Sequence, residues 1–299
     1  ATRKGMTLLA ATGDFGSAQI SCDGSSFQKA VSFPTDDPLV TAVGGTALKA
    51  NAVTGQYRRE TTWNESASYN KATGGGYSKI YRAPFFQRGL LPKNAGRGVP
   101  DLSLNASVNG GVVVLESHGP GGRPTINIMG GTSAAAPELA GIFADAVQMA
   151  HHRLGALNAA LYRLGTGPDY HRLMHDIASG NNILLSSGLR GYTAEDGWDA
   201  VTGWGSPRNA GHFLDALIAA NQAIPPVADA PISTTAPLQR IPTLPPPVTS
   251  TPSIKKGIAQ STPDVPSQPD RHTEAHRSKH QPRPPATGTP TGKKSRAHK

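Results

Sequence analysis

Ser133 stands where a strand-like apolar run meets a helix-like one, in the stretch IMGGTSAAAP (128–137). At such a corner the first helical turn offers free backbone N–H groups and a favourable dipole, which can stabilise an oxyanion. The small residues around the serine would let a substrate carbonyl come close to its hydroxyl. Ser133 is therefore a candidate nucleophile, although Thr132 or Ser133 in this position can also simply cap the helix.

Two aspartates form a second constellation. Asp176 lies in HDIASGNN and Asp199 in GYTAEDGWDAVTGWGSP, and both stretches are rich in loop-forming residues. Calcium prefers six or more hard oxygens, a mixture that carboxylates and backbone carbonyls of bent loops can supply. The alternative is that these aspartates only cap turns.

Five short apolar or β-rich runs predict the strands that position these residues. They are residues 6–13, 37–48, 99–107, 110–117 and 125–131. Apolar residues at 3–4 spacing predict a helix over 132–151. A shorter helix is expected over 157–165, stopped by Gly165, and a last one over 206–222, with Ser206 as cap and Pro207 at its first position. Buried strands that alternate with helices indicate an α/β domain with a mainly parallel sheet.

The element GTSAAAP resembles the G-T-S-x-x-x-P element of the subtilisin and sedolisin families, whose serine is the nucleophile. Further stretches are similar to sedolisin (serine-carboxyl peptidase) motifs specifically and occur in the same order: LLAATGDFGSA, SFPTDDPLVTAVGGT, TGGGYSKIYRAPFFQ and GRGVPDLSLNAS. The resemblance covers about residues 6–210. It implies a subtilisin-like α/β fold and a serine-type endopeptidase that cleaves peptide or protein substrates.

By the same resemblance, Asp14 is the aspartate of the oxyanion hole. A carboxyl group can donate a hydrogen bond to an oxyanion only while it is protonated. This role therefore predicts operation at acidic pH, which also suits a glutamate as the base for the serine. A turn aspartate without a catalytic role is the alternative reading of Asp14.

The glutamate base of the family is not found in this sequence. In sedolisins it lies upstream of the oxyanion aspartate in a helical Glu-x-x-x-Asp, whose spacing puts both carboxyls on one helical face. Only 13 residues precede Asp14, and none is acidic. His151 and His152 lie near the far end of the predicted helix, roughly 27 Å from Ser133 by helical rise. We therefore expect the later part of a catalytic domain, without its first strands and its Glu/Asp helix, and an N-terminal portion of the same domain as partner.

The resemblance also implies one structural calcium ion. The stretches that contain Asp176 and Asp199 are similar to the sedolisin calcium motif. Matched residue by residue, these two aspartates would give carboxylates, and Ile177, Glu195 and Gly197 would give backbone carbonyls. The family usually has glycine at the position of Glu195, and a backbone carbonyl survives that change if the dihedrals suit a residue other than glycine.

The composition divides the chain into residues 1–221 and a tail, 222–299. The tail holds 16 of the 26 prolines, and 11 Lys or Arg against 4 Asp or Glu, whereas residues 1–221 have 18 against 16. Few large apolar side chains predict a disordered tail, either a spacer or a cationic anchor for an acidic surface. The nearly neutral first part argues against a specific nucleic-acid partner. The lone Cys22 excludes an intrachain disulfide, no apolar run could span a membrane, and we expect a secreted or cell-envelope protein.

Two other functions stay open at this point. A degenerate peptidase fold could serve in binding without catalysis, held to an acidic surface by the tail. A subtilisin-type peptidase is disfavoured by Asp14 and by the calcium motif.

Overall fold

The computed structural model describes residues 1–224. The predicted spacer or anchor in the tail therefore lies outside the described residues. Among the residues described, no helix is long and apolar enough to cross a membrane.

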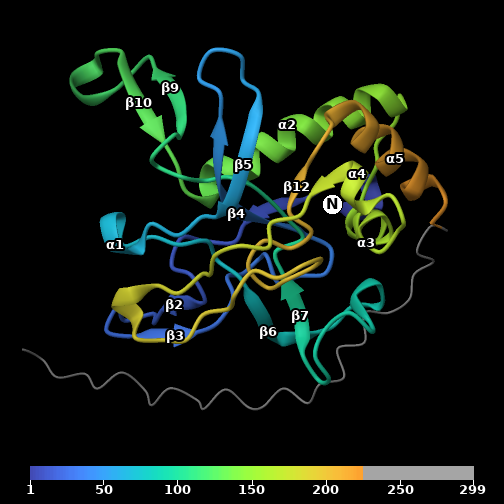
Figure 1. The fold of residues 1–299 in the computed structure, drawn as a ribbon, viewed down its shortest axis with the longest axis horizontal. Coiled ribbons are helices and arrows are strands. Elements are labelled where there is room, and N and C mark those ends of the chain that lie inside the picture. Colours follow the sequence, from blue (N-terminus) through green and yellow to red (C-terminus); the bar gives the residue numbers. More distant parts are fainter. Residues whose placement is uncertain (225–299) are drawn as a thin grey trace, which may run out of the picture. The chain divides into compact units, whose positions relative to one another are not determined.

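The centre of the fold is β4 (Thr41–Ala50), which is buried along its first six residues. Its beginning pairs in parallel with β1 (Leu9–Ala11), and on its other edge it pairs in parallel with β8 (Leu102–Asn105). Its last residues pair antiparallel with β5 (Tyr57–Thr62). Figure 1 shows β4 and β5 at the centre of the fold, with α2 (Thr132–Ala150) packed on β4. The predicted α/β class, with parallel pairing at the core of the sheet, is confirmed.

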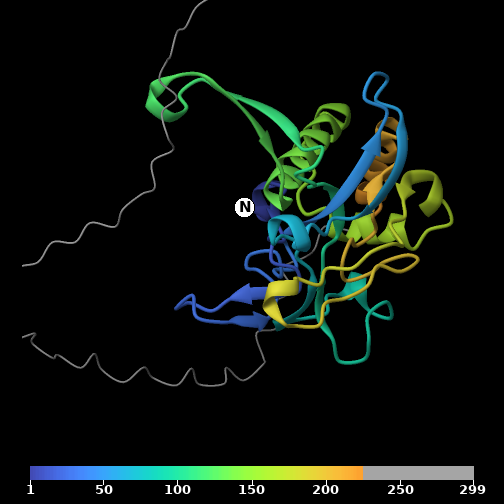
Figure 2. The ribbon, with the colours of Figure 1, turned by 60° about the vertical axis from the view of Figure 1, so that its left-hand side comes forward.

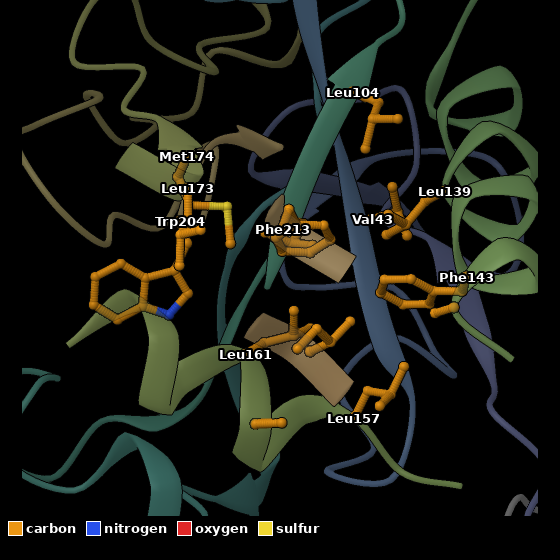
Figure 3. Packing of buried hydrophobic residues seen from close by; sticks show 14 of the residues in the cluster. Val43, Leu104, Leu139, Phe143, Leu157, Leu161, Leu173, Met174, Trp204 and Phe213 are labelled. Carbon is orange, nitrogen blue, oxygen red and sulfur yellow. The ribbon is translucent and has the colours of Figure 1, made fainter. Parts of the chain in front are cut away.

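Three longer helices surround this sheet. The helix α2 (Thr132–Ala150) packs on β1, β4 and β8, while α3 (Asn158–Gly165) and α5 (Ala210–Gln222) pack on each other. Their apolar faces meet in one buried cluster, in which Val43 of β4 lies with Leu139 and Phe143 of α2, as Figure 3 shows. The 3–4 spacing read from the sequence thus predicted the buried face of α2 correctly.

The remaining elements are short and lie mostly in the loops. They are β2 (Ala18–Ile20), β3 (Phe27–Lys29), α1 (Ser66–Tyr69), β6 (Gly76–Arg82), β7 (Gly96–Val99), β9 (Val112–Glu116), β10 (Thr125–Met129), α4 (Tyr170–Leu173), β11 (Met174–His175), β12 (Ser206–Pro207) and four 3₁₀ turns, Thr2–Lys4, Phe85–Gln87, Pro120–Gly122 and Leu185–Ser187.

Two of the predicted strands do not belong to the buried sheet. β9 and β10 pair only with each other, antiparallel, and Figures 1 and 2 show this hairpin, drawn in green, reaching away from α2. Leu115 and Ile126 are register partners, and each is 72% exposed. The apolar composition of these strands was read as burial, but apolar residues alone do not fix where a strand packs.

The predicted start of the last helix is wrong by three residues. Ser206 and Pro207 form β12, which pairs with β11, and Asn209 caps α5 by accepting a hydrogen bond from the His212 backbone N–H at 3.2 Å. The Ser206 hydroxyl instead donates to Glu60 at 2.6 Å. Ser206 and Pro207 suit a helix start by residue type, but their pairing with β11 places them in a strand and leaves the cap to Asn209.

Gly165 is the last residue of α3, but it does not act as the expected helix stop. It is not among the glycines with a positive φ, so it makes no left-handed cap. A Cβ on this residue would lie 2.2 Å from the Trp204 ring. The absence of a side chain therefore admits the indole into the core.

Candidate active site

The corner between β10 and α2 is built around Gly131, the residue that precedes the helix. Its φ of 88° lies in the left-handed region that favours glycine, and its N–H donates to the Ala106 carbonyl at 2.7 Å. A Cβ at this position would come within 2.7 Å of Asp14 Oδ2. Glycine is thus required here both by the backbone and by the carboxyl group beside it.

Asp14 lies directly at the N-terminus of α2. Its Oδ1 accepts hydrogen bonds from the Thr132 backbone N–H and from the Thr132 hydroxyl, each at 2.9 Å. The Gly13 N–H in turn donates to the Thr132 hydroxyl oxygen at 3.0 Å. Asp14, rather than Thr132 or Ser133, therefore caps the helix, and the alternative of a capping serine does not apply to this corner.

Ser133 follows this cap and is solvent-exposed, whereas Thr132 is fully buried. The structure thus brings together the two candidate catalytic residues, which are 119 positions apart in the sequence. Asp14 Oδ2 accepts no hydrogen bond from the described residues, so this oxygen is the one available to a bound substrate. The arrangement offers a hydroxyl and a carboxyl group at the positive end of a helix dipole.

No proton acceptor for Ser133 is found within residues 1–224. Glu65 already accepts five hydrogen bonds, from Trp63, Ser107, Val108 and, twice, Asn109. Glu138 lies five residues further along α2, where burial, followed by repulsion from Glu60, raises its pKa to about 7. His151 follows the last residue of α2 at the opposite end of the helix.

A glycine-rich segment lies beside the Asp14 loop. The Ala72 N–H donates to the Asp14 carbonyl at 3.0 Å, and the Gly74 N–H donates to the Gly13 carbonyl at 2.7 Å. A Cβ on Gly74 would lie 2.0 Å from the Thr12 carbonyl oxygen, so the two backbones approach as closely as only glycine allows. The stretch TGGG resembles a sedolisin motif, and this contact shows that it lies against the loop that contains Asp14.

The two predicted calcium carboxylates lie in neighbouring loops. Both oxygens of Asp199 accept hydrogen bonds, from the N–H groups of Glu195, Val201 and Thr202 and from the Thr202 hydroxyl. The residue is 5% exposed, and burial raises its pKa to about 6. Asp176 Oδ2 accepts from the Gly197 N–H at 2.9 Å, while its Oδ1 is buried without a hydrogen-bond partner.

The backbone of these loops suits the predicted carbonyl ligands. Gly197 has a φ of 80°, whereas Glu195 is not among the residues with positive φ, so its side chain causes no backbone strain. Within residues 1–224, no cluster of three or more His, Cys, Asp or Glu side chains is placed to hold a metal. A cation here would depend on two carboxylates plus carbonyls. Asp176 Oδ1, which is buried without a hydrogen-bond partner, fits such a site, because a bound cation would offset the cost of removing this oxygen from water.

Comparison with known proteins identifies the relatives of this chain. No family model matches it. It is 40% identical over 230 residues to kumamolisin from Bacillus sp. (strain MN-32), covering 74% of this chain and 38% of kumamolisin. It is 36% identical to sedolisin from Pseudomonas sp. (strain 101) over 69% of this chain and 34% of sedolisin. With human tripeptidyl-peptidase 1 it shares 31% identity, over 69% of this chain and 36% of that protein.

The solved structures give the same answer. Pseudomonas sedolisin, a serine-carboxyl proteinase solved in complex with two molecules of pseudo-iodotyrostatin, superposes with a TM-score of 0.60 and 33% identity, covering 73% of this chain and 56% of that chain. The chain thus spans little more than a third of the length of the curated relatives it matches. On fold, sequence and motif order together, it belongs to the sedolisin family of serine-carboxyl peptidases.

Proposed function

We propose that this chain carries the nucleophile and oxyanion half of a serine-carboxyl endopeptidase that works at acidic pH. The observation that carries the proposal is the convergence of Asp14 and Ser133 at the N-terminus of α2. The membership of the chain in a peptidase family supports the same reaction.

In this proposal the Ser133 hydroxyl oxygen attacks the carbonyl carbon of the peptide bond. The developing oxyanion accepts hydrogen bonds from the protonated Asp14 carboxyl and from the Ser133 backbone N–H. The other N–H groups of the first turn are engaged, that of Thr132 with Asp14 and those of Ala134 and Ala135 with the Gly131 carbonyl. Thr132 fixes Asp14 Oδ1, which leaves Oδ2 to carry the proton. The proton of Ser133 passes to a glutamate that residues 1–224 do not supply, and we propose that another portion of the catalytic domain provides it.

A binding test examines this site without requiring turnover. Because Pseudomonas sedolisin has been solved with pseudo-iodotyrostatin, the same compound is a suitable probe here. We expect it to bind this chain at pH 4 and to bind at least about tenfold more weakly to Ser133→Ala, if the serine contributes one strong contact. Ser187→Ala, a serine in a 3₁₀ turn elsewhere, is the control. Equal binding to both variants would contradict the assignment of Ser133.

A non-catalytic binding protein is the second candidate. The absence of a proton acceptor for Ser133 among residues 1–224 favours it, because an unactivated serine is a weak nucleophile. The two functions differ in one result: peptide cleavage that is lost in Ser133→Ala excludes the second candidate.

We also propose one structural Ca²⁺, held by the carboxylates of Asp176 and Asp199 and the carbonyls of Ile177, Glu195 and Gly197. Removing calcium with a chelator should lower the melting temperature, since a ligand that binds only the folded state stabilises it. Calorimetric titration should show one binding event that Asp199→Asn abolishes. Asp196→Asn, in the same loop but outside the proposed ligand set, is the matched control. No heat and no thermal shift would contradict the site.

A further inference from the structure

A pocket of about 380 Å³ lies next to the glycine-rich segment. Gly75 and Gly76 form part of its wall, Ser17 and the end of the β2–β3 hairpin form another part, and Tyr192 closes it from a late loop. This size is within the range of pockets that bind small groups in proteins.

The pocket adjoins the Asp14 loop. Ser17 is three residues after Asp14, and Gly74, which precedes the lining glycines, donates to the Gly13 carbonyl at 2.7 Å. The same two backbone segments therefore border both the candidate oxyanion site and the pocket.

The charged residues that line the pocket are all cationic. Lys29 and Lys79 are the charged residues of the lining, and no Asp or Glu lines it. Among residues 1–224, neither lysine takes part in an ion pair. The Lys29 ammonium lies 4.2 Å from the centroid of the Tyr192 ring, a cation–π contact that holds it at the pocket wall.

The carboxyl groups nearby do not neutralise these lysines. Asp36 lies behind the pocket wall, where it accepts a hydrogen bond from the Ser78 hydroxyl at 2.8 Å, and burial raises its pKa. Glu195 and Asp199 act on Tyr77, a residue of the pocket lining, whose pKa they help to raise after burial and Tyr192. Within residues 1–224, none of these carboxyl groups forms an ion pair with Lys29 or Lys79.

We propose that this pocket binds the acidic side chain of a Glu or Asp residue in the peptide, close to the bond that Ser133 attacks. The inference rests on the proposed peptidase function and names its substrate class. A carboxylate would gain charge-assisted hydrogen bonds from the ammonium groups of Lys29 and Lys79. In the part of the chain that the structure describes, no carboxylate of the chain itself forms an ion pair with either lysine. Tyr77 and Tyr192, whose rings meet edge to face at 5.4 Å, would pack on the methylene part of the side chain.

The test measures equilibrium binding to the full chain in a Ser133→Ala background at pH 5.5. The probes are alanine-based heptapeptides, acetylated and amidated at their ends, with one Glu, Gln or Lys at each position in turn. We expect Glu to bind about fivefold more tightly than Gln at one position, and Lys to bind most weakly. Lys29→Met or Lys79→Met should reduce this preference, and Lys29→Glu should invert it in favour of Lys.

Lys71→Met is the matched control, because the Lys71 ammonium also lies over an aromatic ring, that of Phe15 at 4.3 Å, but does not line the pocket. It should keep the preference for Glu. The preference should also disappear below about pH 4, since a free glutamate side chain is protonated there.

Several results would overturn the inference: equal binding of Glu and Gln at every position, an equal loss in Lys71→Met, or no binding of any peptide. If a Gln peptide with a free C-terminus binds as tightly as the Glu peptide, the pocket recognises a terminal carboxylate, and the side-chain assignment is wrong. The readout does not depend on turnover. Cleavage without a preference for Glu would contradict this inference alone, and Glu-selective binding without cleavage would contradict only the proposed reaction.

Discussion

At the scale of single residues, the candidate site depends on Thr132 as much as on the two residues named from the sequence. Thr132 binds Asp14 through its N–H and its hydroxyl, and its hydroxyl oxygen also accepts from Gly13. It thereby fixes which carboxyl oxygen of Asp14 faces the substrate. The sequence offered Thr132 only as a helix cap, because the contact spans 118 positions and no local pattern reveals it.

Thr132→Val should lower kcat for peptide cleavage about tenfold or more at a pH where the parent is active, with a smaller effect on KM. Valine has nearly the same volume as threonine but removes both hydroxyl contacts, so Asp14 loses its fixed orientation. Thr166→Val, in which the lost hydroxyl contact is a local one to the Tyr162 carbonyl, is the control. Unchanged kcat in Thr132→Val would show that Asp14 needs no such support.

At the scale of elements, the sequence predicted helices and strands that a local residue pattern determines. It missed features that depend on how strands pair and pack. β4 was found because its stretch is a β-rich run, and α2 because its apolar residues repeat with the helix period. The exposure of the β9–β10 hairpin and the start of α5 were missed. The start of α5 depends on partners distant in the chain, since β12 pairs with β11 and Ser206 donates to Glu60. The β9–β10 hairpin pairs only with itself, and its apolar composition does not reveal that it lies outside the buried sheet.

The motif GRGVPDLSLNAS now has a structural explanation in one ion pair. Arg97 and Asp101 are completely buried, their side chains meet at 2.6 Å, and Asp101 also accepts from the Ala42 N–H of β4 at 2.8 Å. The pair thus ties the chain before β8 to the central strand. The resemblance to sedolisins identified the motif, but only the structure shows that the charges of Arg97 and Asp101 are buried.

Arg97→Met should lower the free energy of unfolding by about 3–5 kcal/mol, because it leaves the Asp101 carboxylate buried without its cation. Urea denaturation followed by circular dichroism measures this. Arg172→Met removes the exposed pair with Asp169, which joins at 3.1 Å with both side chains about 60% exposed, and should cost at most about 1 kcal/mol. Similar losses in the two variants would contradict the special place of Arg97.

At the scale of the whole molecule, buried carboxyl groups set how stability depends on pH. Glu60 accepts hydrogen bonds from Thr46 and Ser206, yet burial dominates and raises its pKa. Burial and the neighbouring Glu60 also raise the pKa of Glu138 from 4.5 to about 7. A carboxyl group whose pKa is higher in the folded state stabilises that state while protonated. This contribution is complete below about pH 4.5 and is lost as the pH rises towards 7.

Glu138→Gln should therefore raise the melting temperature at pH 8 and leave it nearly unchanged at pH 4, because glutamine stays neutral at both. Melting curves of the parent and the variant over pH 4–8 measure this. Asp145→Asn, on the same helix, is the control. A variant that gains equally at both pH values would show that the Glu138 charge does not cause the effect.

The chain as a whole matches little more than a third of the length of each curated relative. This partial match affects what can be said of its activity more than what can be said of its family. The family and the fold could be predicted from the order of the motifs, which a partial match preserves. The full set of catalytic residues could not be predicted in the same way, because in such a family the base and the nucleophile come from distant parts of the sequence. The described residues hold the proposed nucleophile and oxyanion donor, and the proposal assigns the base to another portion of the domain.

The most direct test of the central claim is peptide cleavage at pH 4, compared between the parent chain, Ser133→Ala and Asp14→Ala, each with and without an added N-terminal portion of a sedolisin-family catalytic domain. The account predicts cleavage when that portion is present, its loss in Ser133→Ala, and a fall in kcat of about 10²–10³-fold in Asp14→Ala, which removes the hydrogen-bond donor. Cleavage by the complemented parent that persists in Ser133→Ala, or full activity of Asp14→Ala, would contradict it.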